Sequence, residues 1–425
     1  MTAHTNRMPF GPEGNYLHLY APRFFTERHQ TPWGDGINFD GEGSRIVRDF
    51  FIHNALYWLE EYRFDGLRLD AVHAIADDSK PDILTELAEA VRRGPGKARP
   101  IHLVLENDHN AAQYLARGED GSPRWYAAQW NDDFHHAAHL LATGESDGYY
   151  VDYRDRPAGQ LARCLAEGFA YQGDPSRFRG GAPRGEPSAD LPATAFVNLL
   201  QNHDQVGNRA LGERIGELAS PEALRAVTAV LLLAPSTPLL FMGQEFVAVT
   251  PFLYFCDFGE DLAQSVTEGR RREFAHFEHF TDPRAQESIP DPNDPETFLR
   301  SKLDWGALDQ THHAGWYRFH RDLLALRGRE IVPRLTGMEG GASFELLTGS
   351  GSNHCFRVVW RLGDGARLTL TANLGDTEHS IAPPRQEVPG SLLYSEPESA
   401  ARASAEGRLP PWSVAWHLKT AEPAR

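Results

Sequence analysis

Apolar residues recur along this chain with two periods, and these periods predict helices that alternate with strands. Between residues 44 and 63 the apolar side chains are spaced as on one face of a helix, with Ser44 as its N-cap, and the run FDGLRLDAVHAI at 64–75 follows as a short buried strand. Further helices are predicted at 82–93, from 133, at 157–170, 221–234 and 311–327, and further strands at 101–106, 126–130, 195–200 and 238–246. This alternation indicates parallel strands that are covered by helices.

The two ends of the chain have a different pattern. The first 43 residues are rich in Gly, Pro and aromatic residues, which predicts a long surface loop. After about residue 331, short alternating runs such as HCFRVVWRL and ARLTLTANL are separated by Gly-rich turns, as is typical of a small antiparallel β domain. We therefore expect two domains, at residues 1–330 and 331–425.

Composition limits the classes of partner. The chain of 425 residues carries 42 Lys and Arg against 59 Asp and Glu, and the formal charge of -17 argues against nucleic acid and anionic membranes as partners. The cysteines Cys164, Cys256 and Cys355 lie far apart, which argues against a disulfide framework. The sequence has neither a membrane-spanning apolar run nor the pattern of a signal peptide, so we expect a cytoplasmic location.

Acidic residues follow three of the predicted strands: Asp70, Glu106 and Asp204. In a parallel α/β barrel the C-terminal ends of the strands converge on one face, so these three acids are expected to lie there. Arg68 shares a strand face with Asp70, and its charge favours the ionised carboxylate that a nucleophile requires. Such acids suit glycoside hydrolysis, in which one carboxylate attacks the sugar carbon and another protonates the leaving oxygen.

These strand-end residues also have a purely structural interpretation. Arg68 and Asp70 could form a salt bridge that closes a strand, and Asn202, His203 and Asp204 could form a simple capping turn.

Other polar clusters are weaker candidates for a site. The side chains of His135, His136 and His139 have a spacing that can hold zinc, but the glutamate of an HExxH motif is missing and an ordinary helix face is the preferred interpretation. The pair Asp77 and Asp78 is interpreted as part of a solvated loop. The sequence has no phosphate-binding P-loop and no GxGxxG after a strand, so we predict no cofactor and no metal.

Three motifs in a fixed order give the chain a resemblance to a known family. FDGLRLDAVH, LVLEND and FVNLLQNHDQ resemble the nucleophile, acid and third-carboxylate motifs of the α-amylase family of retaining glycoside hydrolases. The resemblance implies that Asp70 is the nucleophile, that Glu106 is the acid/base, and that Asp204 binds sugar hydroxyls and stabilises the transition state. It implies assisting roles for Arg68 and His203, and His73 is expected to line the sugar site.

Within this family the chain most resembles the maltooligosyltrehalose trehalohydrolases, which cut the α-1,4 bond next to a terminal trehalose. The matching strings are FGPEGNYL, FFTERHQTPWGDGINFDG, AQWNDDFHHAAHLLATGE, FMGQEF, PFLYFCDF, EGRRREF and SKLDW. The resemblance implies a neutral α-glucan substrate, a part in trehalose biosynthesis, and contact between the trehalose end and the loop pair Phe178 and Arg179. The branching enzymes share several of these strings, so a glucanotransferase is the alternative.

One part of the family pattern has no counterpart in this sequence. The strand that normally precedes GPEGNYL, the two strand-helix units before it and an N-terminal β domain are missing. We therefore expect an incomplete (β/α)8 TIM barrel, about strands four to eight, with a C-terminal antiparallel β-sandwich. A catalytically silent glucan-binding remnant is a further alternative, and the sequence leaves the oligomeric state open.

Overall fold

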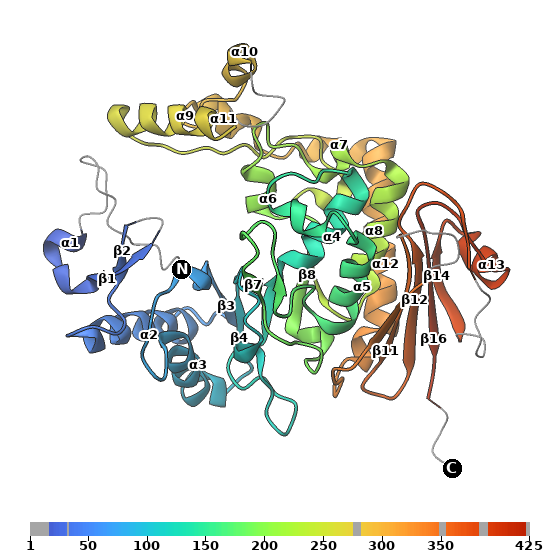
Figure 1. Ribbon diagram of the computed structural model, residues 1–425, viewed down its shortest axis with the longest axis horizontal. Coiled ribbons are helices and arrows are strands. Elements are labelled where there is room, and N and C mark those ends of the chain that lie inside the picture. The colour runs from blue at the N-terminus through green and yellow to red at the C-terminus, as the bar shows by residue number, and fades with distance from the viewer. Residues whose placement is uncertain (1–16, 32–33, 275–281, 348–353, 382–389, 422–425) are drawn as a thin grey trace. The chain divides into compact units, whose positions relative to one another are not determined.

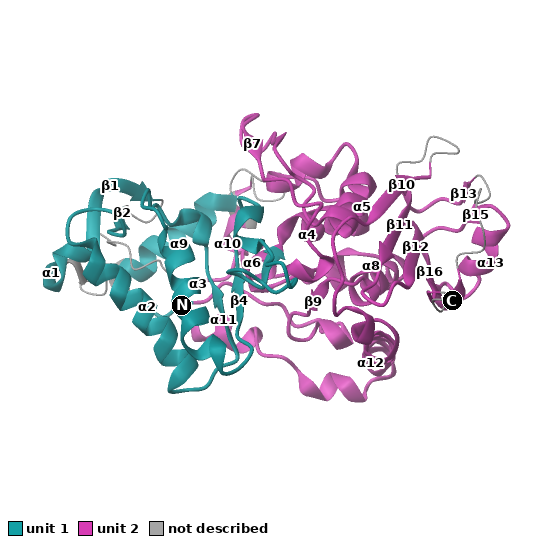
Figure 2. Ribbon diagram, turned by 90° about the horizontal axis from the view of Figure 1, so that it is seen from below, with its two compact units in different colours: residues 1–130, 256–276 teal, residues 131–255, 277–425 magenta. Residues whose placement is uncertain are grey.

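The computed structural model describes residues 17–31, 34–274, 282–347, 354–381 and 390–421. The chain divides into two compact units (Figure 2): unit 1 comprises residues 1–130 and 256–276, and unit 2 comprises residues 131–255 and 277–425. Within the described ranges, no helix has the length and the apolar content that a membrane crossing requires.

Unit 1 contains the first three parallel strands that the sequence predicts. Its helices are α1 (Leu17–Tyr20), α2 (Ser44–Glu60), α3 (Ile83–Arg93) and α9 (Glu260–Phe274), and its strands are β1 (Phe25–Thr31), β2 (Gly34–Ile37), β3 (Gly66–Leu69), β4 (His102–Leu105) and β5 (Ala128–Asn131), whose last residue belongs to unit 2. Strand β3 pairs in parallel with β4, and β4 pairs in parallel with β5. The predicted alternation of helices and parallel strands is therefore confirmed in this unit.

Two predictions for the N-terminal part are wrong. The predicted surface loop contains an antiparallel hairpin, β1 with β2, between residues 25 and 37. Its first strand is only partly buried, so it lacks a clear apolar alternation that would reveal it. Ser44 is the first residue of α2, and the N-cap is Gly43, whose φ of 75° is a left-handed conformation that glycine adopts at little cost.

A buried arginine connects α2 to the segment before α3. The Nη1 of Arg48 donates to an Asp77 carboxylate oxygen at 2.9 Å, and its Nε donates to Glu86 at 2.7 Å. The Asp77 side chain is only 3% exposed, so its interpretation as a solvated loop residue is wrong. The carboxylate compensates the buried guanidinium, because a buried charge requires a partner.

Unit 2 holds two more parallel strands and the C-terminal sheet. Its helices are α4 (Asp132–Thr143), α5 (Pro157–Glu167), α6 (His203–Gly207), α7 (Ile215–Leu218), α8 (Pro221–Leu233), α10 (Pro283–Glu287), α11 (Pro295–Arg300), α12 (Thr311–Glu330) and α13 (Ala400–Ala405). Its strands are β6 (Asp174–Pro175), β7 (Pro183–Arg184), β8 (Phe196–Leu199), β9 (Thr237–Leu239), β10 (Ser343–Leu346), β11 (Cys355–Arg361), β12 (Arg367–Asn373), β13 (His379–Ser380), β14 (Ser391–Glu396), β15 (Arg408–Leu409) and β16 (Ser413–Lys419). Strands β8 and β9 are parallel, as the sequence predicts.

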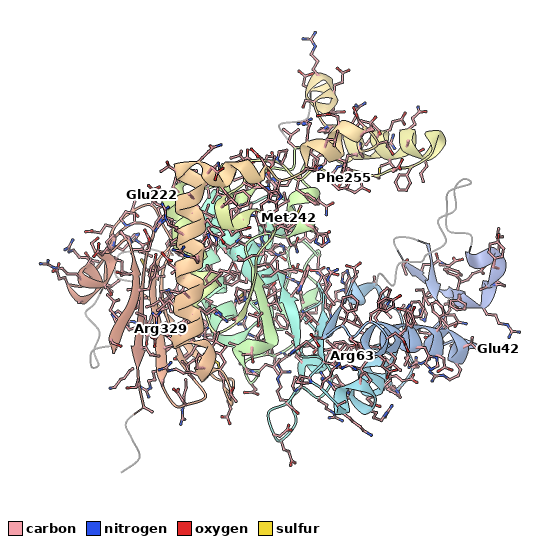
Figure 3. All side chains as sticks on the ribbon, turned by 180° about the vertical axis from the view of Figure 1, so that it is seen from behind. Glu42, Arg63, Glu222, Met242, Phe255 and Arg329 are labelled. Carbon is pink, nitrogen blue, oxygen red and sulfur yellow. The ribbon has the colours of Figure 1, made fainter. Side chains whose placement is uncertain are left out.

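Helices and parallel strands of unit 2 run in opposite directions. Figure 3 shows Glu222, at the start of α8, and Met242, just after β9, at one end of the unit, whereas Arg329, near the end of α12, lies at the other end. The C-terminal end of β9 therefore lies on the same side as the N-terminal end of α8. Loops on that side carry the functional residues of parallel α/β proteins.

The C-terminal strands form the antiparallel sheet that the sequence predicts. The sheet has the order β10-β11-β12-β16-β14, and α5 and α8 pack against it (Figure 1). Its core is continuous with that of the helices: Trp360 stacks on Trp416 with ring centroids 5.7 Å apart, and its Nε1 donates to the carbonyl of Leu165 in α5 at 2.8 Å. The predicted boundary after residue 330 coincides with the end of α12, but the hydrophobic core extends across it.

Candidate active site

Two of the predicted acids lie at adjacent strand ends in unit 1. Leu69 of β3 is in register with Leu105 of β4, so Asp70 and Glu106 are the next residues on neighbouring parallel strands. The ladder continues past the strands, because the amide of Glu106 donates to the carbonyl of Leu69 at 2.9 Å. The backbone pairing thus brings these two carboxylates to one edge of the sheet, as expected for parallel strands.

Arg68 lies between the two carboxylates. Its Nη1 donates to an oxygen of Asp70, and its Nη2 lies 3.7 Å from an oxygen of Glu106. The guanidinium also lies over the Trp130 ring of β5, with its central carbon 4.1 Å from the ring centroid. The guanidinium is thus hydrogen-bonded to Asp70, close to Glu106 and stacked on Trp130, which fixes its orientation between the two acids. The contact with Glu106 and the role of Trp130 were missed by sequence reasoning.

The backbone after β3 provides a further constraint on Glu106. Ala71 has a φ of 42°, an uncommon conformation for a residue other than glycine, and its amide donates to the Glu106 carboxylate. The Asp70 and Glu106 side chains remain 19% and 17% exposed. They are therefore held in place and still open to a ligand.

The fourth predicted residue in this unit is His73. Its Nδ1 accepts from the amide of Asp108 at 3.4 Å, and its ring lies 5.5 Å from that of His109. In the neutral ring this assigns the proton to Nε2, which makes that nitrogen a hydrogen-bond donor.

The third predicted acid, Asp204, lies in unit 2 in the first turn of α6. The side chain of Asn202 accepts from the amides of Asp204 and Gln205 at 2.8 and 3.0 Å, so Asn202 is the helix cap. The carboxylate of Asp204 does not cap the helix, and its side chain is half exposed beside His203 at 3.4 Å. The capping interpretation is thus right for Asn202 and leaves Asp204 accessible to a ligand.

Phe178 and Arg179 lie on a turn between β6 and β7 of unit 2. The Phe178 side chain is 57% exposed, and its ring approaches that of Tyr149 edge-on, with the ring centroids 6.3 Å apart. The nearby Asp204 charge adds to the effect of burial in raising the pKa of Tyr149. Sequence reasoning missed Tyr149, and the pair of tyrosines in DGYYVDY is a signal that could have drawn attention to it.

The histidines of α4 are buried packing residues. The Nδ1 of His135 lies 2.8 Å from the carbonyl of Leu200, and its Nε2 lies 2.9 Å from the hydroxyl of Tyr150. Burial lowers the pKa of His135 to about 3 and that of His136 well below its ordinary value. This face of α4 is buried inside the unit. Both ring nitrogens of His135 have partners within the protein, as is expected of a structural residue.

One group of described residues has the composition of a cation site. Ligand atoms of His29, Asp40 and Asp78 lie within 4.8 Å of one another. However, Arg28 lies 3.5 Å from Asp40 and 2.8 Å from Asp78, so a positive charge already compensates these carboxylates.

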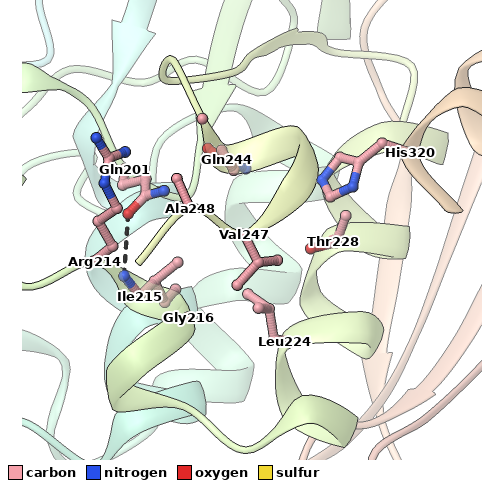
Figure 4. A pocket seen from close by; sticks show the side chains of 11 residues that line it. Gln201, Arg214, Ile215, Gly216, Leu224, Thr228, Gln244, Val247, Ala248 and His320 are labelled. Atoms are coloured by element: carbon pink, nitrogen blue, oxygen red, sulfur yellow. Dashed lines mark hydrogen bonds between the residues drawn. The ribbon is translucent and has the colours of Figure 1, made fainter. Parts of the chain in front are cut away.

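The cavities of unit 2 are separate from the predicted residues. A small pocket of about 10 Å³ lies between the segments around Gln201, Arg214, Thr228, Gln244 and His320 (Figure 4). It has room for about one water molecule, which is far too little for a sugar ring. A wider hollow of about 530 Å³ is formed by α12 and the end of β14. Neither space includes a predicted site residue, so the exposed ends of strands remain the candidate active site.

Comparison with known proteins identifies several relatives of this chain. Residues 350–416 match the model described as a domain of unknown function (DUF3459). The chain is 40% identical over 376 residues to the malto-oligosyltrehalose trehalohydrolase of Deinococcus radiodurans, which covers 86% of this chain and 59% of the relative. It is 43% identical over 414 residues to that of Rhizobium sp. (strain M-11), which covers 95% of this chain and 65% of the relative. The chain thus spans about three fifths of the length of these relatives.

A solved structure agrees over almost the whole chain. The crystal structure of a Salmonella typhimurium protein assigned to the alpha amylases superposes with a TM-score of 0.86 at 42% identity, covering 99% of this chain and 67% of that one.

Proposed function

We propose that the chain, which belongs to the α-amylase family and is 40% and 43% identical to two malto-oligosyltrehalose trehalohydrolases, hydrolyses the α-1,4-glucosidic bond next to the terminal trehalose of maltooligosyltrehalose. The observation that carries this proposal is the arrangement of Arg68, Asp70 and Glu106 at neighbouring strand ends. An arginine that binds one partly exposed carboxylate and lies close to a second suits a retaining glycosidase, which needs a nucleophile and an acid close together. The product would be free trehalose.

In the first step, Asp70 attacks the anomeric carbon and forms a covalent glycosyl ester. The bond to the trehalose oxygen breaks, and Glu106 donates its proton to that oxygen. In the second step Glu106, now the base, takes a proton from water, and the water oxygen displaces Asp70. Arg68, whose Nη1 donates to Asp70, orients the nucleophile for its attack.

The remaining predicted residues bind the substrate in this proposal. Asp204 accepts hydrogen bonds from sugar hydroxyls, with His203 beside it, and the Nε2 of His73 donates to a further hydroxyl. Phe178 and Arg179 contact the trehalose end. The half-exposed Asp204 and exposed Phe178 support these roles, because both can reach a ligand.

The resemblance also extends to the fold. We infer that β3, β4, β5, β8 and β9 correspond to strands four to eight of a (β/α)8 barrel, that residues 1–330 contain this partial barrel, and that residues 331–425 are a β-sandwich domain. The parallel pairs β3 with β4 and β8 with β9 support this assignment.

Product analysis tests the function. Purified protein is incubated with maltooligosyltrehalose, and free trehalose and new reducing ends are measured together. Hydrolysis yields one trehalose and one reducing end for each bond cut, whereas a branching-type transferase leaves the number of reducing ends unchanged. A folded protein that yields no trehalose contradicts the proposal and favours a glucan-binding remnant.

The matched variants are Asp70→Asn and Asp65→Asn. Asp65 stands just before the same strand, is 86% exposed and pairs with Arg99, so it controls for the loss of an arginine-bound carboxylate. We expect Asp70→Asn to lose roughly 10³-fold or more of the activity, because no nucleophile remains. Asp65→Asn should retain the activity, and equal losses in both variants would contradict the assignment of Asp70.

A further inference from the structure

The turn that carries Phe178 and Arg179 is tightly closed at its base. Strands β6 and β7 pair antiparallel on either side of it, and the amide of Ser176 donates to the carbonyl of Ala182 at 2.9 Å. Gly180 and Gly181 have φ values of 65° and 90°, which other residues adopt only with strain. The base of the turn is therefore fixed by its own backbone, and the tip is closed by the amide of Gly180, which donates to the carbonyl of Arg177 at 3.0 Å. The amide of Phe178 takes no part in these backbone bonds.

The tip is held by a carboxylate from another segment. In the segment 148–153, the Oδ1 of Asp152 accepts from the amide of Phe178 at 2.9 Å, and its Oδ2 accepts from the hydroxyl of Ser176 at 2.6 Å. The same Ser176 oxygen accepts from the amide of Arg179 at 3.1 Å. The Asp152 carboxylate thus binds the residues on both sides of Arg177, namely the hydroxyl of Ser176 and the amide of Phe178. Hydrogen bonds to carboxylates are among the stronger ones.

Asp152 is itself rigidly placed. Its backbone carbonyl accepts from the hydroxyl of Tyr171 at 2.7 Å and from the side-chain Nε2 of Gln160 at 3.0 Å. Three residues earlier in the same segment, the Tyr149 ring packs edge-on against Phe178. Burial raises the pKa of Tyr149, and the negative charges of Asp132 and Asp204 add to this effect. The segment 148–153 therefore connects the turn to the surroundings of a predicted substrate-binding acid.

We propose that Asp152 is a positioning residue that holds Phe178 against Tyr149, fixes the backbone of Arg179 through Ser176, and thereby makes the enzyme selective for a trehalose end. This inference rests on the proposed function, since it assumes that the turn borders the trehalose moiety. Asp152 touches no substrate itself. It restricts the orientations of the exposed Phe178 ring and of Arg179 before a sugar binds. Less conformational entropy is therefore lost on binding.

The same two segments offer a matched control. Asp155 pairs with Arg177 of the turn, but both side chains are about 60% exposed. Exposed ion pairs contribute little to stability, so Asp155→Ala removes a contact between the segments without releasing the tip. Asp152→Ala removes both carboxylate acceptors, and Ser176→Ala removes only the hydroxyl that connects Asp152 with Arg179.

The first measurement is amide hydrogen exchange over the segment 172–185. We expect the Phe178 amide to exchange at least about tenfold faster in Asp152→Ala, an intermediate change in Ser176→Ala and no change in Asp155→Ala. Unchanged exchange at Phe178 in both Asp152→Ala and Ser176→Ala would overturn the anchoring role. If Asp152→Ala does not fold, Ser176→Ala alone decides the point.

The second measurement is calorimetric binding of trehalose and of maltose. We expect trehalose to bind about tenfold more weakly to Asp152→Ala with maltose affected much less, whereas Asp155→Ala binds as the wild type does. Equal weakening for both sugars, or no trehalose binding by the wild type, overturns the selectivity role. Because neither measurement uses turnover, failure here is distinct from failure to release trehalose from maltooligosyltrehalose.

Discussion

The sequence contains two clusters of polar residues, and the structure shows that they differ in their exposure to solvent. At the ends of β3 and β4, the carboxylates of Asp70 and Glu106 share one arginine and stay partly exposed. On α4, the three neighbouring histidines are buried, and the ring nitrogens of His135 face a carbonyl and a hydroxyl of the protein. Both clusters consist of residues that catalyse reactions elsewhere, so residue type alone does not separate them.

The difference lies in how the hydrogen-bonding capacity is used. The side chain of Arg68 is buried at its Nε and Nη2, and neither atom has a hydrogen-bond partner among the described residues. Buried polar atoms usually have partners, so such exceptions concentrate where strain or function favours them. His135 has both nitrogens engaged and no solvent access, as is expected of a residue that stabilises the fold. Loss of the first cluster should therefore affect turnover, and loss of the second should affect stability.

The largest expected effect comes from Glu106→Gln. The glutamine keeps the size of the side chain but cannot protonate a leaving oxygen, so trehalose release should fall by roughly 10²-fold to 10⁴-fold. Hydrolysis of an α-maltosyl fluoride should fall less in its first step, because fluoride leaves without a proton. Steady-state and single-turnover kinetics on the two substrates measure this difference.

The Glu106 assignment has a clear counter-result. Equal losses on both substrates would show that Glu106 does not act as the acid. A lost activity together with a lowered unfolding midpoint would show that the side chain supports the fold in the same way as the α4 histidines do.

The next effect in size is on stability, and it belongs to the other cluster. His135→Ala removes the partners of Leu200 and Tyr150 inside the unit, so we expect a loss of about 2–4 kcal/mol of unfolding free energy in urea titrations. The half-exposed His203 is the matched control, and His203→Ala should change this free energy by no more than about 0.5 kcal/mol. Similar values for both variants would remove the distinction between a buried and a half-exposed histidine.

Sequence patterns predicted those parts of the molecule whose signal is local. The helices α2, α3, α8 and α12 have apolar periodicity, strands β3 and β4 are short runs followed directly by an acid, and β8 is a short buried run. By contrast, the hairpin β1–β2 is partly exposed, and α9 reads EDLAQSVTEGRRREF without a regular apolar stripe, so neither had a pattern to detect.

Contacts between distant segments were outside the reach of sequence reasoning. The placement of Arg68 beside Asp70 follows from strand alternation, whereas its contact with Glu106 and its stacking on Trp130 depend on which strands become neighbours. Likewise, Asp77 is buried against Arg48, which lies 29 residues earlier in the chain. No local sequence pattern indicates that pairing.

The smallest expected effect is the pH dependence that His135 adds to stability. Its pKa is lowered from 6.5 to about 3 in the folded protein, so between these values the unfolded chain binds a proton that the folded protein does not. The contribution is complete above pH 6.5 and is lost as the pH falls, by about 1.4 kcal/mol per pH unit. Replacing His135 by Asn, whose amide can still donate to the carbonyl of Leu200, removes this titration. Urea unfolding at pH 7 and pH 5 should therefore show a drop in unfolding free energy that is about 2 kcal/mol smaller in the variant than in the wild type. An equal drop in both proteins would mean that His135 is protonated in the folded state. The contrast between the buried α4 histidines and the partly exposed acids at the ends of β3 and β4 would then fail.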